Sequence, residues 1–87
     1  MKPKQATTIG VDVAKKTLDV ALLFSDESYT NENFSNDANG IKQLLSWIRK
    51  QGGQGCPLCL EATGRLEMKL CLMGYQAQYP IRLVPPV

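Results

Sequence analysis

Residues 7–24 read TTIGVDVAKKTLDVALLF and contain two β-strand patterns joined by a short polar turn. Apolar β-branched residues occupy every second position from Ile9 to Val13, while Gly10 and Asp12 fall between them. This alternation predicts a strand from Thr7 to Val13 with one apolar face. The apolar run of residues 17–24 is long enough to be its antiparallel partner, which predicts a hairpin.

The pattern continues outward into a third strand and a helix. Residues 28–34 are mostly polar, which is typical of a solvated edge strand. Asn36 or Asp37 can cap a helix that ends at Gly52-Gly53. Its apolar positions follow the helical i, i+3, i+4, i+7 spacing and are Ile41, Leu44, Leu45 and Ile48.

The rest of the chain predicts two parallel strands and a second helix. Residues 56–60 form a short apolar run that ends at Glu61, residues 65–73 have helical spacing closed by Gly74, and residues 78–84 precede Pro85. The order is therefore β-β-β-α-β-α-β. Because parallel strands need a right-handed crossover, we expect an α/β fold with a mixed RNase H-like sheet, antiparallel in its first three strands and parallel afterwards.

Composition limits the classes of protein to consider. The chain has 87 residues, 44% of them apolar and 21% charged, which indicates one small folded domain spanning residues 1–87. A net charge of +2 is too small to indicate a nucleic-acid surface without clustering. No apolar run could span a bilayer and no signal peptide is evident, so we expect a cytoplasmic protein. The absence of histidine leaves carboxylates as the expected catalytic groups.

Two carboxylates stand out. Asp12 lies in an otherwise apolar strand, and Glu61 follows Leu60 at the carboxyl end of a predicted parallel strand, where open α/β sheets bind ligands. If these strands are neighbours, the carboxylates converge and suit Mg²⁺ or Mn²⁺. The alternative is that Asp12 accepts hydrogen bonds in the hairpin turn and Glu61 caps the next helix. Asp19 is a possible third acid, although pairing with a nearby lysine or exposure to solvent is favoured.

Other motifs predict less specific roles. Three cysteines (Cys56, Cys59 and Cys71) include a CxxC pair, but a structural zinc site needs four ligands, so buried free thiols are expected. The aromatic residues Trp47, Tyr75 and Tyr79 are predicted to be packing residues rather than base-stacking platforms.

Basic residues and a turn are predicted at the same end of the sheet as the two acids. Lys15 and Lys16 lie in the first hairpin turn, and Thr63 and Arg65 follow Glu61. Such a cluster would favour a phosphate backbone, and Thr63 could alternatively cap the second helix. Each cation taken singly is more often an ordinary solvated charge.

Several of these segments together resemble the insertion-sequence 110 family of DEDD transposases, which is related to the Piv invertase. The resemblance runs from about Thr7 to the end of the chain, through IGVDVAKKTLDVAL, then Gly40-Ile41, the LEATG motif of residues 60–64, Met73-Gly74-Tyr75 and residues 83–86. Arg65-Leu66 departs from the Gly-aromatic pair that is usual after LEATG.

The resemblance implies an amino-terminal RuvC-like domain in which four acids hold metal ions against DNA. Asp12 matches the first acid and would bridge two ions, and Glu61 matches the second as a terminal ligand. The family also implies two later aspartates, a carboxyl-terminal domain with a nucleophilic serine, a structured guide RNA and assembly as a homo-oligomer. We therefore expect an incomplete domain that does not recombine DNA alone.

Two other functional classes remain open. The same sheet could serve a non-catalytic interaction module or an inactive transposase remnant, for which metal titration would be the discriminating measurement. A sugar kinase or actin-like ATPase also begins with an acid after glycine, but it needs a second phosphate loop that 87 residues cannot supply.

Overall fold

The structure, a computed structural model, describes residues 5–62 and 64–85 and contains the predicted sequence of elements. The strands and helices are β1 (Ala6–Val13), β2 (Thr17–Phe24), β3 (Tyr29–Ser35), α1 (Ala38–Lys50), β4 (Leu58–Glu61), α2 (Met68–Gln76) and β5 (Ile81–Val84). The predicted β-β-β-α-β-α-β order is therefore confirmed.

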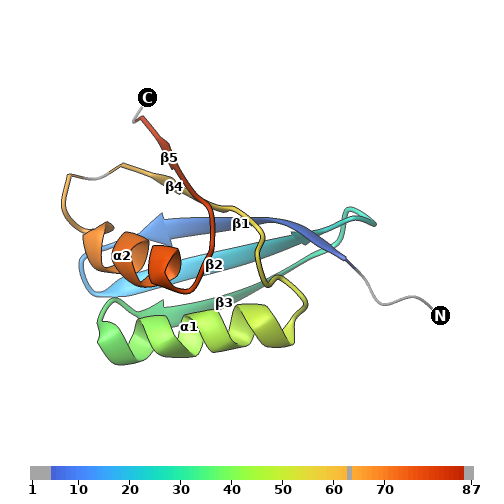
Figure 1. Ribbon diagram of the computed structural model, residues 1–87, viewed down its shortest axis with the longest axis horizontal. Helices are drawn as coiled ribbons and strands as arrows, with labels where there is room; N and C mark the ends of the chain where they lie inside the picture. Colours follow the sequence, from blue (N-terminus) through green and yellow to red (C-terminus); the bar gives the residue numbers. More distant parts are fainter. Residues whose placement is uncertain (1–4, 63, 86–87) are drawn as a thin grey trace.

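The five strands form one mixed sheet in the order β3-β2-β1-β4-β5 (Figure 1). The first three strands form an antiparallel meander, and β4 and β5 add to it in parallel. This arrangement confirms the expected RNase H-like sheet. Because the chain crosses over through α1 before it forms β4, β1 becomes the central strand and pairs with two partners.

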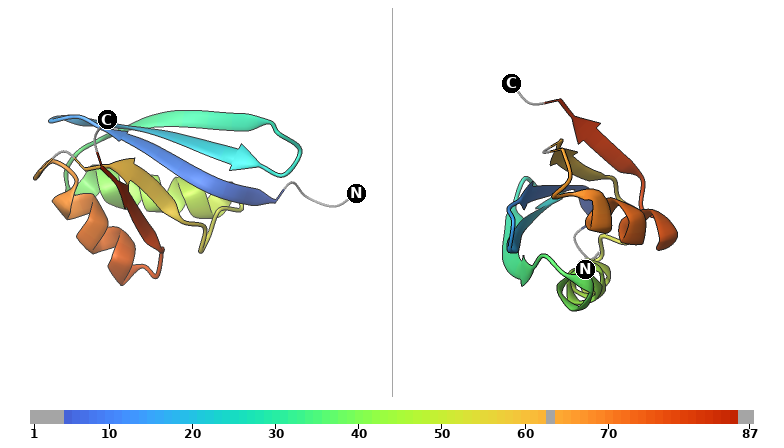
Figure 2. Two further views of the ribbon diagram at one scale, coloured as in Figure 1. Left: turned by 90° about the horizontal axis from the view of Figure 1, so that it is seen from above. Right: turned by 90° about the vertical axis from the view of Figure 1, so that its left-hand side faces the viewer.

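One face of the sheet is covered and the other is open. Side chains alternate along β2, so that Leu18, Val20 and Leu22 are buried while Asp19 and Ala21 are exposed. Both helices pack on the buried face (Figure 2). The opposite face, which carries Asp19 and Ala21, is called the open face below.

Helix α1 begins as the sequence predicts. Asp37 is its N-cap, and the Asp37 carboxylate accepts a hydrogen bond of 2.7 Å from the Gly40 amide. This bond, together with one from the Ser35 hydroxyl, holds the pKa of Asp37 below its usual value. Among the described residues, no helix is long and apolar enough to cross a membrane.

Three predicted boundaries are wrong by a few residues. Strand β4 begins at Leu58 rather than at Cys56, because Cys56 is in a turn in which its amide bonds the Gly53 carbonyl. Strand β5 begins at Ile81 rather than at Gln78. Helix α2 runs from Met68 to Gln76 instead of residues 65–73.

Gly74 does not end α2 but lies inside it. A Cβ atom there would come within 2.8 Å of the Leu58 side chain and 3.2 Å of the Ile81 side chain. The glycine therefore lets the helix approach β4 and β5 closely. A close helix–sheet contact and a helix end give the same signal in sequence, which explains the wrong assignment.

Two other glycines, Gly40 and Gly10, allow a matched test of where the fold requires a residue without a side chain. We expect Gly40→Ala to lower the free energy of unfolding by about 1–3 kcal/mol, because a Cβ at Gly40 would overlap the carbonyl of Ser35. Gly10→Ala should instead raise it by about 0.5–1 kcal/mol, because a Cβ at Gly10 meets nothing within 4 Å and alanine restricts the unfolded chain. Urea denaturation of both variants measures the contrast, and equal effects would contradict it.

Candidate functional site

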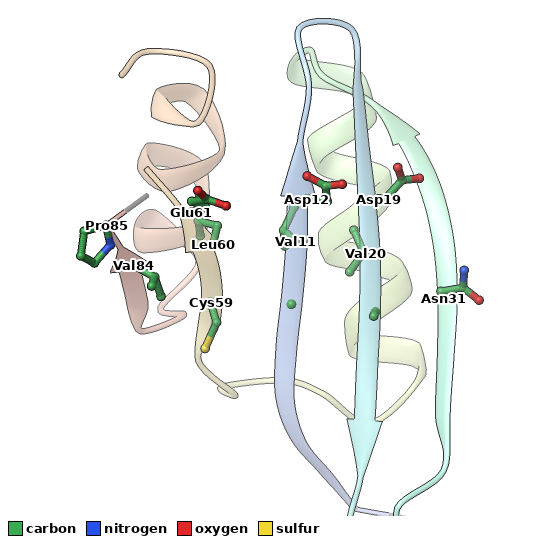
Figure 3. Close-up of a pocket in the computed structure, with 12 residues that line it drawn as sticks. Val11, Asp12, Asp19, Val20, Asn31, Cys59, Leu60, Glu61, Val84 and Pro85 are labelled. Atoms are coloured by element: carbon green, nitrogen blue, oxygen red, sulfur yellow. The ribbon is translucent and has the colours of Figure 1, made fainter. Parts of the chain in front are cut away.

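Three carboxylates lie on three neighbouring strands of the open face. Asp12 on β1 is paired directly with Asp19 on β2. On the other side of β1, Val11 pairs with Leu60, so that Asp12 and Glu61 each follow the last paired residues. Figure 3 shows Glu61, Asp12 and Asp19 at the same level of their strands. Since adjacent strands are about 4.8 Å apart, the fold brings together the two acids that the sequence singles out.

A depression of about 670 Å³ lies beside these acids and is lined by them. Its lining includes the neighbouring row of small residues, in which Gly10 pairs with Ala21 on one side and with Cys59 on the other. A Cβ at Gly10 would meet no atom within 4 Å, so packing does not require this glycine. The small side chains keep the sheet accessible next to Asp12.

Asp19 has a polar partner on the edge strand. Asp19 is exposed, and exposure to solvent is one of the two roles predicted for it. Its carboxylate accepts a hydrogen bond of 2.6 Å from the side-chain amide of Asn33. Like charges placed directly opposite each other on a sheet repel. Asp12 and Asp19 therefore concentrate negative charge at the centre of the open face.

The alternative interpretations of the two acids are that Asp12 accepts hydrogen bonds in the hairpin turn and that Glu61 caps the next helix. The bonds of the hairpin turn come from the Ala14 amide to Thr17 and from the Asn36 amide to Lys16. The N-cap of α2 is Glu67, six residues beyond Glu61 along the chain, and Glu61 itself is the exposed last residue of β4. Among the described residues, the hydrogen bonds of the hairpin turn do not involve Asp12, and α2 does not begin at Glu61.

The predicted cations lie near the end of the sheet that carries Asp12 and Glu61. Lys15 and Lys16 are exposed in the β1–β2 turn, and Arg65 is exposed in the segment after β4. The turn and that segment are adjacent, because the side chain of Asn36 donates hydrogen bonds to a carbonyl in each of them. Thr63, the remaining predicted contact, lies outside the described residues.

Asn36 is the residue that sequence reasoning missed. Its side-chain amide donates to the Ala14 carbonyl at 2.9 Å and to the Leu66 carbonyl at 3.1 Å. From local patterns Asn36 is only an alternative helix cap, because its two acceptors are distant in the chain. Because Asp37 by itself can cap α1, the neighbouring Asn36 is free for another role, and this is the local signal of that role in the sequence.

The cysteines are free thiols and are half-buried rather than fully buried. Burial raises the pKa of Cys56, whose thiol donates to the Ala6 carbonyl at 3.2 Å. Burial and the nearby Glu67 carboxylate raise the pKa of Cys71.

In the part of the chain that the structure describes, no group of three or more histidine, cysteine or acidic side chains could hold a metal.

The aromatic residues divide into packed and exposed groups. Trp47 packs against Phe34, with ring centroids 5.9 Å apart, and Tyr79 is only 5% exposed. The prediction that Tyr75 is a packing residue is wrong, because this side chain on α2 is 74% exposed.

Comparison with known proteins identifies relatives of nearly the whole chain. Residues 9–87 match the model of the insertion-sequence 110 DEDD family, described as a transposase. The pilin gene-inverting proteins of Moraxella bovis and Moraxella lacunata are each 30% identical over 83 residues, which is 93% of this chain. The chain spans only 26% of the length of these relatives.

The Asn36 bonds predict a stability effect at the site. We expect Asn36→Ala to lower the free energy of unfolding by about 1–3 kcal/mol, because two carbonyl groups lose their shared donor. Amide hydrogen exchange should speed up in the β1–β2 turn and in residues 64–67, while the amides of β5 remain protected. Uniform acceleration over the whole sheet would contradict a local linking role.

The pairing of Asp12 with Asp19 predicts a substitution that stabilises the protein, in contrast to Asn36→Ala. We expect Asp19→Asn to raise the free energy of unfolding by about 0.2–1 kcal/mol at low salt, because it removes the repulsion from Asp12. An asparagine oxygen can still accept the bond from Asn33. The gain should shrink in high salt, where exposed charges are screened. Urea denaturation at two salt concentrations checks both effects, and a loss of stability would count against repulsion.

Proposed function

This chain belongs to the insertion-sequence 110 family of DEDD transposases, and we propose that it forms the amino-terminal part of an enzyme that cleaves and transfers DNA strands with a divalent metal ion. The observation that carries the proposal is the placement of Asp12 and Glu61 at the same level of two neighbouring strands. The names of the relatives favour rearrangement of DNA, either transposition or inversion.

The donor chemistry of the site fits Mg²⁺ or Mn²⁺. Both Asp12 and Glu61 offer exposed carboxylate oxygens, which hard cations prefer. Magnesium is commonly held by one or two carboxylates, with water and substrate phosphate supplying the other ligands. Two acids are thus enough to begin a site, which further acids of a full-length protein would complete. When bound, such an ion stabilises negative charge that develops on a phosphate during strand cleavage.

The remaining residues of the site would position the substrate. The exposed cations Lys15, Lys16 and Arg65 lie at the end of the sheet that carries the acids, where they can hold phosphates on either side of the reacting one. We assign the same phosphate-binding role to Thr63. Gly10 leaves room for a sugar–phosphate backbone to lie against β1, which is a recognised reason for glycine within a strand.

The proposed partners are those of a full-length recombinase. DNA is the substrate, a structured guide RNA is a further partner, and several copies of the protein act together. Membership of the family supports DNA as the substrate, and the guide RNA and the homo-oligomer are proposed from the resemblance to that family.

A second candidate function is a protein-binding module without catalysis. Helix α2 exposes Met68, Leu72 and Tyr75, which recur at the spacing of one helix face. An exposed apolar face of this kind is typical of an interaction surface. Such a module would not require the carboxylates of Asp12 and Glu61 to act together.

Metal titration distinguishes the two functions. Isothermal titration of the 87-residue chain with Mn²⁺ should show saturable binding, and both Asp12→Asn and Glu61→Gln should weaken it by about tenfold or more, since cation affinity follows the charge of the ligands. Glu32→Gln is the matched control, because it removes an exposed carboxylate from edge strand β3.

The control makes the outcome decisive. Equal weakening by Glu32→Gln would indicate diffuse attraction of cations, and absence of saturable binding would favour the protein-binding module. In a strand-transfer assay with Mg²⁺, we expect the 87-residue chain to be inactive by itself. Robust turnover that Asp12→Ala abolishes would show that expectation to be wrong.

A further inference from the structure

A second charged surface lies on helix α1. The sequence has no acidic residue between Asp37 and Glu61, and the only charged residues in this interval are Lys42, Arg49 and Lys50. All three are exposed on α1, whose apolar residues face the sheet. The outer side of α1 is therefore a positive surface without a neutralising charge in its own segment, and it is called the basic face below.

Two depressions flank this helix and share part of their lining. The first, of about 260 Å³, has Lys42 and Arg49 on one side and Gln54 and Tyr79 on the other. The second, of about 330 Å³, is lined by Lys42 and Lys50 among others. Ser46 and Lys42 line both depressions and so separate them. Each depression thus offers two cations to an anionic group.

The surroundings of the first depression supply further donors. The positive charge of Arg49 acts on the Tyr79 phenol and partly opposes the rise in its pKa that burial causes. Arg49 and Tyr79 line the same depression. A phosphate in the depression would meet charged groups on α1 and neutral hydrogen-bonding groups opposite.

The length of the basic face suits several phosphates. Lys42 and Lys50 are eight residues apart along α1, which corresponds to about 12 Å at 1.5 Å per residue. A strand of duplex DNA carries a phosphate for about every 3.4 Å along its axis. The basic face can therefore contact successive phosphates of one backbone.

The aromatic residue on this surface argues against a single-stranded ligand. Proteins that bind single strands stack bases on available aromatic rings. Trp47 is half-buried and its ring packs against Phe34, so it offers no free stacking platform. A helix that lies along the wide major groove of B-form DNA can reach the phosphates at the edge of that groove, whereas the major groove of duplex RNA is too deep and narrow to admit a helix.

The basic face and the acidic row point away from each other. Figure 3 shows α1 behind the sheet and Asp12, Asp19 and Glu61 in front of it. Without a metal, the acids repel nucleic acid while the basic face attracts it. A DNA segment on α1 is therefore a different segment from one that reacts at the acids.

We propose that the basic face of α1 binds the phosphate backbone of a duplex DNA segment through Lys42, Arg49 and Lys50. This binding needs no metal and no catalysis, so it stands apart from the proposed strand transfer. It gives the chain two nucleic-acid surfaces on opposite sides of one sheet.

Salt-dependent binding tests the proposal. Fluorescence anisotropy with a labelled duplex DNA, in EDTA and over a range of salt, should give a linear dependence of log affinity on log salt. Each phosphate contact contributes about 0.9 to the slope, so Lys42→Gln combined with Arg49→Gln should reduce the slope by about two. The same double variant should bind on the order of tenfold more weakly at low salt.

Three controls locate the effect. Lys69→Gln with Arg82→Gln removes the same charge from α2 and β5 and should change the slope by less than about one contact. Lys42→Arg with Arg49→Lys preserves the charge and should retain the slope, because the slope depends on the number of cations in contact with phosphates; circular dichroism of the Gln double variant checks separately that it folds. The EDTA in the assay is the third control, because it keeps any metal ion away from Asp12 and Glu61, so failure of the catalytic proposal would not change this result.

Three results would overturn the proposal. Equal loss of slope in the two charge-removing variants would mean that net charge alone governs binding. A variant effect seen with duplex RNA and not with duplex DNA would assign the basic face to a different nucleic acid. Absence of binding by the unmodified chain at low salt would remove the surface altogether.

Discussion

The parallel pairing of β4 with β1 is the constraint on which the site depends. Ile9 pairs with Leu58 and Val11 with Leu60, and all four side chains are buried under the helices. Because side chains alternate along a strand, burial of Val11 and Leu60 on one face sends the next residue of each strand to the other. A register shift of one residue would expose the apolar residues and bury a carboxylate, so the core that stabilises the fold also sets the register of the acids.

Charge follows the same division of the sheet into two faces. The acids at positions 12, 19 and 61 occupy the open face, while the three cations of α1 lie beyond the opposite face. A net charge of +2 hides this separation, because the opposite charges nearly cancel in the sum. The distribution is what matters for nucleic acid, since a local field acts over about one Debye length, roughly 8–10 Å.

The glycines show how one residue type serves different physical purposes. Gly40 is required by packing, because a Cβ there would overlap the carbonyl of Ser35, and a Cβ at Gly74 would crowd the end of the Leu58 side chain. Gly10 has open space above it and costs the central strand stability relative to alanine. A glycine that the folded chain does not need is consistent with a ligand that approaches closely, which supports the role proposed for the open face.

Local patterns were sufficient for the element order, for a helix cap at Asn36 or Asp37 and for singling out Asp12 and Glu61 as isolated charges, because alternation, helical spacing and isolated charges are readable within a few residues. They were insufficient for the interior position of Gly74, the two bonds of Asn36 and the pairing of Asp12 with Asp19. Each of these depends on which distant segments pack together. Only the folded sheet, through its strand order and register, decides that the three acids share one face and that the cations of α1 lie behind it.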